Sequence, residues 1–268
     1  MTDRIPTMRL RSMLSLLVVV LAACTGGSVV EETTPSTVDV TTTQPVPETT
    51  TTTVDPRPVW EGFEATRTEP HTLAAYAQAP LDVFEAPDDI EPKMTVEPTT
   101  ILGTVTVLGV VTGPVDGWVE VMLAVRPNGS TGWVRTDDLS FYVADSQIIV
   151  DLGKRSLSYL IDGVEVLYTD VGIGSRYNET PTGEYFVTDS VTLSDPNSAW
   201  GPHALGLSAR SDTITEFNGG DGIIGIHGTN NPSSIGANIS LGCVRLPNEM
   251  ITALHEMVPI GTRVEIRA

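Results

Sequence analysis

Two residues in the C-terminal half of the chain have the types and the spacing for nucleophilic catalysis. His227 follows the apolar run at residues 223–226, and Cys243 lies 16 residues later, directly after Gly242. A cysteine reacts as its thiolate, and a nearby imidazole is a common base for generating that thiolate. Gly242 allows a tight backbone conformation before the thiol, which leaves the amides of Gly242 and Cys243 free to bind the oxygen of a reacting carbonyl. The pattern predicts a cysteine nucleophile with a histidine base; the alternative is a buried structural cysteine near an unrelated histidine.

The sequence around this pair resembles the signature of the L,D-transpeptidase catalytic-domain family. Members have His-Gly-Thr-Asn, then a loop of Ser, Asn, Pro and Gly, then Ser-x-Gly-Cys followed by Val or Ile and Arg, and residues 226–246 show the same order. Residues 180–185, Thr-Pro-Thr-Gly-Glu-Tyr, resemble the family's Thr-Pro-x-Gly-x-aromatic element. Many members have a second histidine directly before Gly-Cys, where this chain has Leu241. The motif therefore leaves His227 as its only base.

The resemblance implies a reaction and a substrate. An enzyme of this kind would attack a carbonyl of a peptidoglycan stem peptide with Cys243 and form a thioester. A second stem amine would resolve the thioester into a 3-3 cross-link, whereas water would make the enzyme an L,D-carboxypeptidase. Peptidoglycan stem peptides are therefore the expected partners. No metal or cofactor is expected, because the sequence has no His, Asp or Cys cluster beyond this pair.

The resemblance also assigns residues around the pair. It implies that the backbone carbonyl of Gly228 orients His227, and Asp221 is a rival for this role that the sequence leaves open. Ser240 and Arg245 occupy motif positions, and we interpret them as shaping the site and binding a substrate carboxylate. Hydrogen bonds that stabilise the loop are the alternative role for both residues.

Composition limits the possible partners. The 268 residues carry a formal net charge of −19, and the pI is near 4.4. This charge argues against nucleic-acid binding, which needs clustered cations, and it gives no electrostatic attraction to anionic lipid. The chain has two cysteines. If Cys24 carries a lipid, Cys243 has no disulfide partner, which indicates a task for its thiol in an oxidising compartment.

The first 66 residues are interpreted as export, anchoring and linker segments. Residues 1–24 combine arginines, a short apolar core and Leu-Ala-Ala-Cys, which is typical of a lipoprotein signal that ends at a lipidated Cys24. The alternative is a transmembrane helix, but the apolar core is shorter than the ~20 residues that such a helix needs. Residues 25–66 are rich in Thr and Pro without apolar periodicity, and they are predicted to be a disordered linker. We therefore expect a protein outside the cytoplasm, lipid-anchored to the cell membrane and facing the cell wall.

Residues 67–143 are predicted to form a small β-barrel module that resembles the bacterial Src-homology-3-like modules of cell-wall proteins. The resemblance rests on short apolar runs at residues 101–111 and 118–125, a turn at residues 126–129, and the Gly-Trp-Val repeats that contain Trp118 and Trp133. The two tryptophans are either a ligand-stacking surface or part of the barrel core.

Residues 146–268 are predicted to form a mainly β catalytic domain, a β-sandwich with one short helix near the C-terminus. Strands are expected at residues 147–152, 156–161 and 164–168, and Asp162-Gly163 is a strong hairpin turn. Residues 171–184 are expected to be a loop, and residues 195–206 a long loop over the cleft.

The C-terminal segment predicts a helix and a closing strand. Pro247 suits the first turn of the helix, and Val264 and Ile266 alternate as expected for the strand. The apolar face of the helix is predicted from Met250, Ile251, Leu254, Met257 and Val258. His255 lies away from this face and is expected at the surface, and His203 is interpreted as structural or exposed.

Two other functions remain open at this point. One is a different peptidoglycan-modifying cysteine enzyme, although the usual wall peptidases place Cys before His in the chain and here His227 comes first. The other is a non-catalytic wall-binding lipoprotein, which would need neither Cys243 nor His227. A cell-wall L,D-transpeptidase explains both residues.

Overall fold

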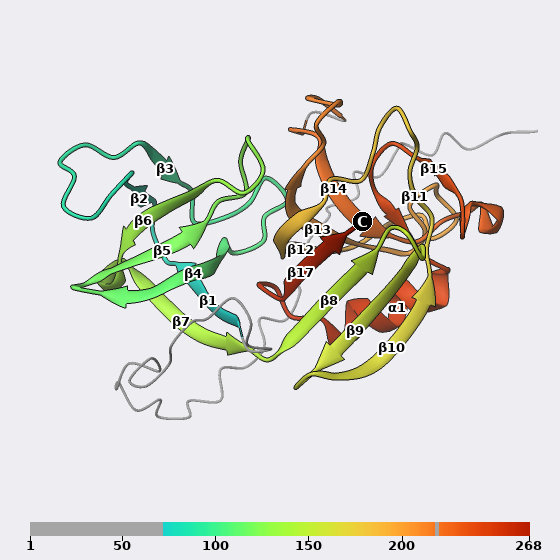
Figure 1. The fold of residues 1–268 in the computed structure, drawn as a ribbon, viewed down its shortest axis with the longest axis horizontal. Helices are drawn as coiled ribbons and strands as arrows, with labels where there is room; N and C mark the ends of the chain where they lie inside the picture. Colours follow the sequence, from blue (N-terminus) through green and yellow to red (C-terminus); the bar gives the residue numbers. More distant parts are fainter. Residues whose placement is uncertain (1–71, 218–219) are drawn as a thin grey trace, which may run out of the picture. The chain divides into compact units, whose positions relative to one another are not determined.

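The computed structural model describes residues 72–217 and 220–268. The predicted signal peptide, the lipidated Cys24, the linker at residues 25–66 and the first residues of the module lie outside these ranges. Within them, the one α-helix is too short to cross a membrane. The described chain is mainly β (Figure 1), as the sequence predicts.

The first part of the described chain, residues 72–144, is called the module below. Its five-stranded sheet has the order β6-β5-β4-β1-β7, with every pair antiparallel, and β2 and β3 form a separate pair. The elements are β1 (Thr72–Ala77), β2 (Leu81–Val83), β3 (Met94–Val96), β4 (Val107–Val115), β5 (Trp118–Met122), β6 (Thr131–Arg135), the 3-10 turn η1 (Thr136–Asp138) and β7 (Leu139–Ala144).

The tryptophans of the module have different environments. Trp118 is buried, with Phe84 packed edge-on against its ring at 5.2 Å and the Arg135 guanidinium 4.3 Å above it. This burial favours the core role for Trp118, whereas Trp133 is half-buried. The apolar run predicted at residues 101–111 is a strand only from Val107, because Ile101 lies in an exposed turn.

The second part, residues 145–268, contains the remaining elements. They are β8 (Ser146–Asp151), β9 (Ser156–Ile161), β10 (Val164–Asp170), β11 (Ile173–Gly174), β12 (Gly183–Thr192), β13 (His203–Arg210), β14 (Ile223–His227), the 3-10 turn η2 (Pro232–Ser234), β15 (Asn238–Ser240), β16 (Val244–Arg245), α1 (Asn248–Met257) and β17 (Arg263–Arg267). The predicted hairpin is confirmed: Asp162 and Gly163 both have positive φ, which suits a tight two-residue turn between β9 and β10.

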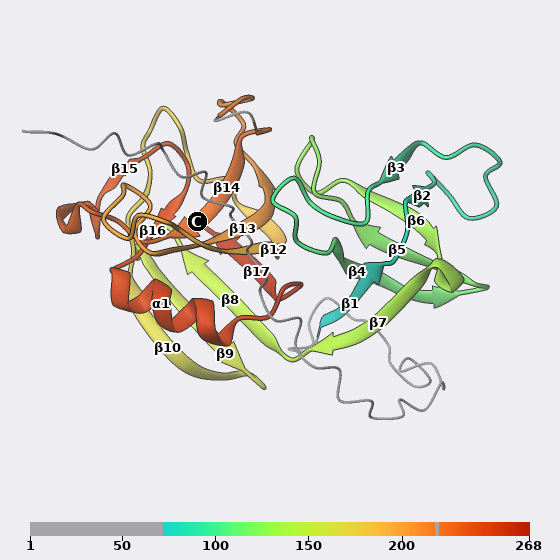
Figure 2. The same ribbon diagram turned by 180° about the vertical axis from the view of Figure 1, so that it is seen from behind.

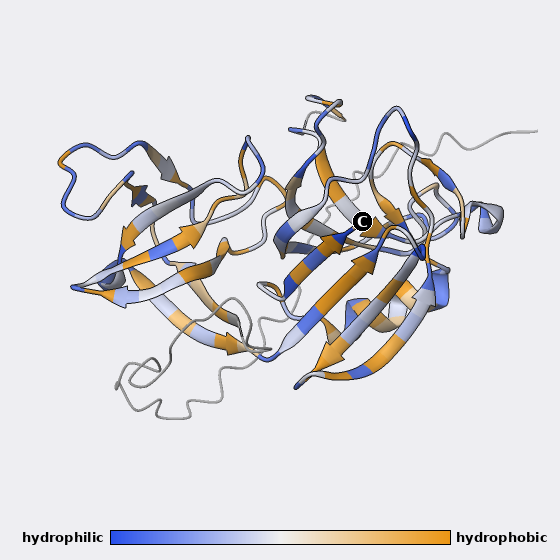
Figure 3. Cartoon of the chain, in the orientation of Figure 1, coloured by the Kyte–Doolittle hydropathy of each residue, from blue (hydrophilic) through white to orange (hydrophobic). Residues whose placement is uncertain are grey.

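Eight of these strands form one curled sheet with the order β10-β9-β8-β17-β12-β13-β14-β16. The long strand β12 links its two halves, because residues 183–186 pair with β17 and residues 187–192 pair with β13. A strand that changes partners in this way turns the corner between two packed layers. The inward side chains of both halves belong to one core cluster, which includes Ile148, Leu205 and Ile226. Figure 3 shows apolar stretches along these strands.

The predicted helix and closing strand are present, and one residue of the predicted helix face and one predicted loop need correction. Helix α1, which lies in front of the sheet in Figure 2, begins directly after Pro247. It packs against β13 and β14, with Ile251 and Leu254 fully buried. Met257 does not belong to the buried face; it ends the helix and is 39% exposed. The predicted loop at residues 195–206 is also too long, because residues from His203 onward pair with β12 and β14 as β13.

The module and the second part share apolar contacts. Phe186 of β12 is buried in the core cluster of the module. Its ring lies so close to Gly109 of β4 that a Cβ added to this glycine would be 3.3 Å away. The Tyr142 hydroxyl donates a hydrogen bond to the Ile260 carbonyl. Burial of that hydroxyl raises the pKa of Tyr142 to about 12. The boundary predicted between residues 143 and 146 therefore separates two sheets whose side chains are in contact.

Candidate active site

The register of two short parallel strands brings His227 and Cys243 into one site. Strand β14 pairs with β16 so that Ile226 lies opposite Val244 and His227 opposite Arg245. Cys243 directly precedes β16 and therefore reaches the same end of the sheet as His227. The amide of Gly225 donates to the Cys243 sulfur at 3.4 Å, a contact that sequence reasoning missed.

The turn that presents the thiol is held by hydrogen bonds on both sides. The Ser240 hydroxyl donates to the Cys243 carbonyl at 2.6 Å and accepts from the Gly242 amide at 3.1 Å. From the other side, the Thr180 hydroxyl donates to the Gly242 carbonyl at 2.8 Å. Gly242 has a φ of 118°, and a Cβ there would lie 2.8 Å from an Ile224 methyl, so glycine is required.

These contacts change the expected roles of two residues. The Gly242 amide already donates to Ser240, so it is not free for an oxyanion in this conformation, contrary to the expectation from sequence. The Ser240 side chain is buried and both of its contacts lie within the turn. This geometry favours the loop-stabilising alternative for Ser240 and leaves the Cys243 amide as the oxyanion donor to be tested.

His227 is buried and held in one orientation. Its Nδ1 lies 2.6 Å from the Gly228 carbonyl, and the Trp200 ring stacks on the imidazole with centroids 4.6 Å apart. A carbonyl only accepts, so Nδ1 carries the proton and Nε2 has the lone pair that a base needs. Asp221, the rival orienting residue, instead forms ion pairs with Arg126 and Arg210.

Both members of the pair are neutral near pH 7. Burial lowers the pKa of His227 to about 4, with the Arg245 charge adding to this and the hydrogen bond to Gly228 opposing it. Burial raises the pKa of the Cys243 thiol, whereas the Gly225 amide and the Arg245 charge lower it. The site therefore rests as thiol and imidazole, with two groups placed to stabilise a thiolate when it forms.

Arg245 brings a half-buried cation to the site, with its Nε atom buried. Its Nε has no hydrogen-bond partner among the residues that the structure describes. A buried polar atom without a partner costs about 1–3 kcal/mol, and more for a charged group. A ligand that supplies an oxygen to this guanidinium would remove that cost.

The two catalytic candidates and Arg245 lie at the base of a cavity of about 180 Å³ with apolar walls. One wall comes from Trp200, in the segment before β13. Trp200 also stacks on Phe217 at 6.2 Å. Ile214 and Leu241 add to the apolar lining, and Arg245 supplies a charged group to it.

The structure also pairs two histidines that the sequence leaves unconnected. His203 of β13 and His255 of α1 stack with centroids 4.0 Å apart, and Ser190 and Thr192 hydrogen-bond to the His255 ring. Burial and the neighbouring His203 lower the pKa of His255. Neither histidine lines the pocket described above. In the ranges 72–217 and 220–268, no group of three or more His, Cys, Asp or Glu side chains is arranged to hold a metal ion.

Comparison with known proteins adds a family. Residues 145–266 match the YkuD family of L,D-transpeptidase catalytic domains. The chain is 32% identical over 125 residues to the L,D-transpeptidase YkuD of Bacillus subtilis, covering 47% of this chain and 68% of that protein. It is 33% identical over 134 residues to YqjB of the same species, covering 46% and 71%, and 36% identical over 121 residues to YkuD of Bacillus licheniformis, covering 45% and 64%. The chain thus spans about two thirds of the length of each relative.

Proposed function

Because the chain belongs to the L,D-transpeptidase catalytic-domain family, we propose that it forms 3-3 cross-links between peptidoglycan stem peptides through a thioester on Cys243. One observation carries the proposal: Cys243 and a His227 fixed by the Gly228 carbonyl line the same pocket. A structural cysteine would need neither the pocket nor the fixed imidazole.

The first half of the reaction forms the thioester. His227 Nε2 takes the proton of the thiol as the Cys243 sulfur attacks the carbonyl carbon of the third residue of a donor tetrapeptide stem. The tetrahedral intermediate collapses, the C–N bond to the terminal D-alanine breaks, and the imidazolium gives its proton to the leaving amine. Because the resting pair is neutral, the negative charge appears on sulfur and oxygen only during attack, next to the Gly225 amide and Arg245.

The second half returns the enzyme to its starting state. The amine of an acceptor stem attacks the thioester carbon and loses a proton to His227. The C–S bond then breaks and the thiolate is protonated again, leaving an amide cross-link. We assign the oxyanion to the backbone amide of Cys243, because the Gly242 amide is used by Ser240. Such a donor contributes about 3 kcal/mol to transition-state stabilisation in other acyl-transfer enzymes.

Arg245 is proposed to bind a carboxylate of the donor stem. Its guanidinium lines the pocket with a buried Nε that lacks a partner, and stem peptides carry carboxylates. A charge-assisted hydrogen bond there would orient the donor carbonyl toward the sulfur. The apolar walls would hold the aliphatic part of the stem.

The N-terminal segment is proposed to place this reaction outside the cytoplasm. The lipoprotein-type signal predicts a lipid on Cys24, and the linker at residues 25–66 would let the enzyme reach into the cell wall from the membrane surface. Detergent partitioning of wild-type protein and of a Cys24→Ser variant tests the anchor. A wild-type protein that stays in the aqueous phase contradicts it.

A carbapenem, which mimics the donor stem as an acylating agent, tests the chemistry. We expect intact mass spectrometry to show one adduct per chain, and we expect none on Cys243→Ser. Incubation with purified tetrapeptide-containing disaccharides should then yield dimers whose fragmentation shows a link between two third residues. Release of D-alanine without dimers would instead identify an L,D-carboxypeptidase.

A further inference from the structure

One wall of the pocket is formed by residues that contact the module. Ile214 and Phe217 line the cavity, as do Gly222 and Ile223 where the chain returns to β14. The two described stretches, residues 211–217 and 220–222, are called the pocket wall below. Its ends meet through a hydrogen bond from the Ser211 amide to the Gly222 carbonyl at 2.8 Å.

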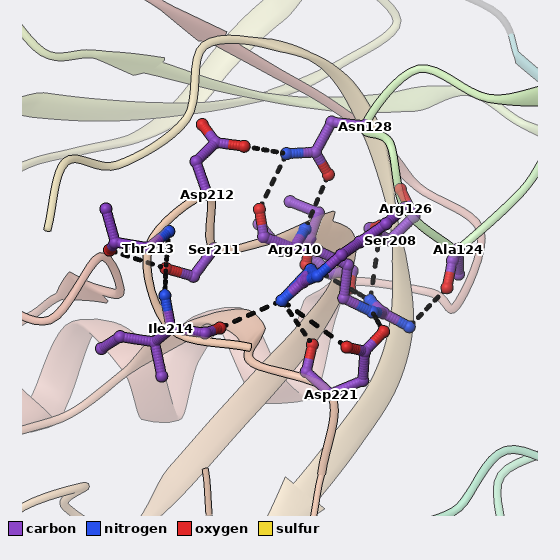
Figure 4. Close-up of polar contacts among 12 residues, drawn as sticks. Ala124, Arg126, Asn128, Ser208, Arg210, Ser211, Asp212, Thr213, Ile214 and Asp221 are labelled. Atoms are coloured by element: carbon purple, nitrogen blue, oxygen red, sulfur yellow. Dashed lines mark hydrogen bonds and ion pairs between the residues drawn. The ribbon is translucent and has the colours of Figure 1, made fainter. Parts of the chain in front are cut away.

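Arg126 of the module contacts both stretches of the pocket wall. Its Nη2 donates to the Ile214 carbonyl at 3.0 Å and to the Asp221 carbonyl at 3.3 Å, and it lies 3.5 Å from the Asp221 carboxylate (Figure 4). Arg126 itself does not line the cavity. One nitrogen thus holds both carbonyls, and its two N–H bonds have directions fixed by the planar guanidinium, which a freely rotating ammonium does not provide.

Asn128 of the same turn holds the strand from which the wall begins. Its side-chain amide donates to the Arg210 carbonyl at 2.7 Å, and its Oδ1 accepts from the Arg210 amide at 2.8 Å (Figure 4). The Arg210 guanidinium in turn bonds to the Ala124 carbonyl of the module and pairs with Asp221 at 3.3 Å. The contacts from residues 124–128 of the module join positions more than 80 residues apart in sequence.

The pocket wall is tightly packed where it returns at Gly222. Gly222 has a φ of 55°, and a Cβ there would lie 1.9 Å from the Ile214 carbonyl oxygen and 2.9 Å from Arg126 Nη2. Ile214 O, Gly222 and Arg126 are therefore in direct packing contact. A shift of the Arg126 guanidinium would move Ile214, which lines the cavity together with Phe217 and Trp200.

We propose that the turn at residues 126–128 of the module positions the pocket wall, so that the module determines how the donor stem is held. Arg126 and Asn128 are positioning residues, since they act through Ile214, Asp221 and Arg210. This inference rests on the proposed function for its substrate. It makes the module a structural part of the active site.

The test compares two reagents for the same thiol in the purified full-length chain. Iodoacetamide needs access to Cys243 but no binding pocket, whereas a carbapenem must first occupy the pocket. We expect Arg126→Ala to raise the carbapenem concentration for half-maximal acylation, and the KM for donor stem, about tenfold, because it removes hydrogen bonds to a charged group. The alkylation rate and the Tm should stay within about twofold and a few degrees of wild type.

Two further variants separate positioning from charge and folding. Arg126→Lys keeps the charge and loses the planar Nη2 group that donates to both carbonyls, so it should recover only part of the affinity. Arg135→Ala is the matched control, because its guanidinium stacks on Trp118 within the module, and it should leave both reagents unaffected. Equal slowing of both reagents in Arg126→Ala, or unchanged carbapenem acylation, overturns the inference.

Hydrogen exchange keeps the test independent of the reaction. The amides of residues 211–217 should exchange faster in Arg126→Ala than in wild type, and those of Arg135→Ala should not change. Unchanged exchange overturns the inference even where acylation is lost. A wild-type chain that forms no carbapenem adduct contradicts the proposed function instead, and the exchange comparison still decides whether Arg126 positions the wall.

Discussion

The floor of the pocket and its wall are built in different ways. The pocket floor consists of Gly225 to His227 and residues 240–245, and its contacts join neighbouring strands and a tight turn. The wall depends on a guanidinium and an amide that come from the module, more than 80 residues away in the chain. We infer that residues of the pocket floor perform the reaction and that the pocket wall binds the substrate. Changes in the two regions should therefore have separable effects.

The largest expected effect comes from substituting the catalytic pair in the pocket floor. Cys243→Ser should lower transpeptidation by at least about a thousandfold, because a serine hydroxyl is far less acidic than a thiol and the neutral imidazole is not tuned to activate it. His227→Ala should be almost as severe. The double variant should be little worse than either single variant, since the two residues act as a unit.

Cross-link formation measured by mass spectrometry and iodoacetamide alkylation across pH check this prediction. Leu241 cannot titrate, so the alkylation profile of wild type should depend on one nearby imidazole, and that of His227→Ala should move toward a free thiol. A His227→Ala chain with wild-type rates at every pH would remove His227 as the base.

The next effect concerns stability at acid pH. His227 has a pKa of about 4 when folded and about 6.5 when unfolded. As pH falls below 6.5 the unfolded chain binds the proton first, so folding free energy is lost between pH 6.5 and about 4, by about 3 kcal/mol for this group. A conservative His227→Gln variant should lack this part of the pH dependence. The free energy of unfolding is measured by urea unfolding at pH 7 and pH 4.5 for both proteins. An equal loss of unfolding free energy between the two pH values in wild type and His227→Gln would contradict the prediction.

A matched pair of glycine substitutions compares the two regions directly. Gly242 in the pocket floor and Gly222 in the pocket wall both have positive φ and no space for a Cβ. Each change to Ala should therefore cost about 1–3 kcal/mol of stability. Their chemical effects should differ. Gly242→Ala should displace the thiol and slow both iodoacetamide and carbapenem, whereas Gly222→Ala should slow the carbapenem alone. The two second-order rates, measured on the same preparations, test this; equal effects on both rates in Gly222→Ala would mean that the wall also controls the thiol.

The smallest expected effect is at the second histidine site. His255 stacks on His203 and bonds to Ser190 and Thr192, and it does not line the pocket. His255→Ala should therefore change neither the acylation rate nor its pH profile. The same pH series used for His227→Ala provides the measurement. A shifted profile in His255→Ala would show that His255 is coupled to His227.

Sequence alone was informative where local rules act. The Asp162-Gly163 turn, the strands on either side of it and the alternation of Val264 and Ile266 follow from turn chemistry and a period of two. The motif around Cys243 resembles the signature of the family, and its glycine, thiol and imidazole suit a cysteine nucleophile with a histidine base. The helix was also predicted from its period, although Met257, its last residue, is exposed.

Only the tertiary structure decided which groups face one another. Nothing in the spacing of the chain places Trp200 on His227, His203 on His255 or Arg126 on Ile214. It also decided that Ser240 uses the Gly242 amide and that Asp221 pairs with arginines and leaves His227 to Gly228. The physical reason is that backbone preferences extend over a few residues, whereas these contacts depend on strand register and on the packing of distant elements, which the whole folded chain sets together.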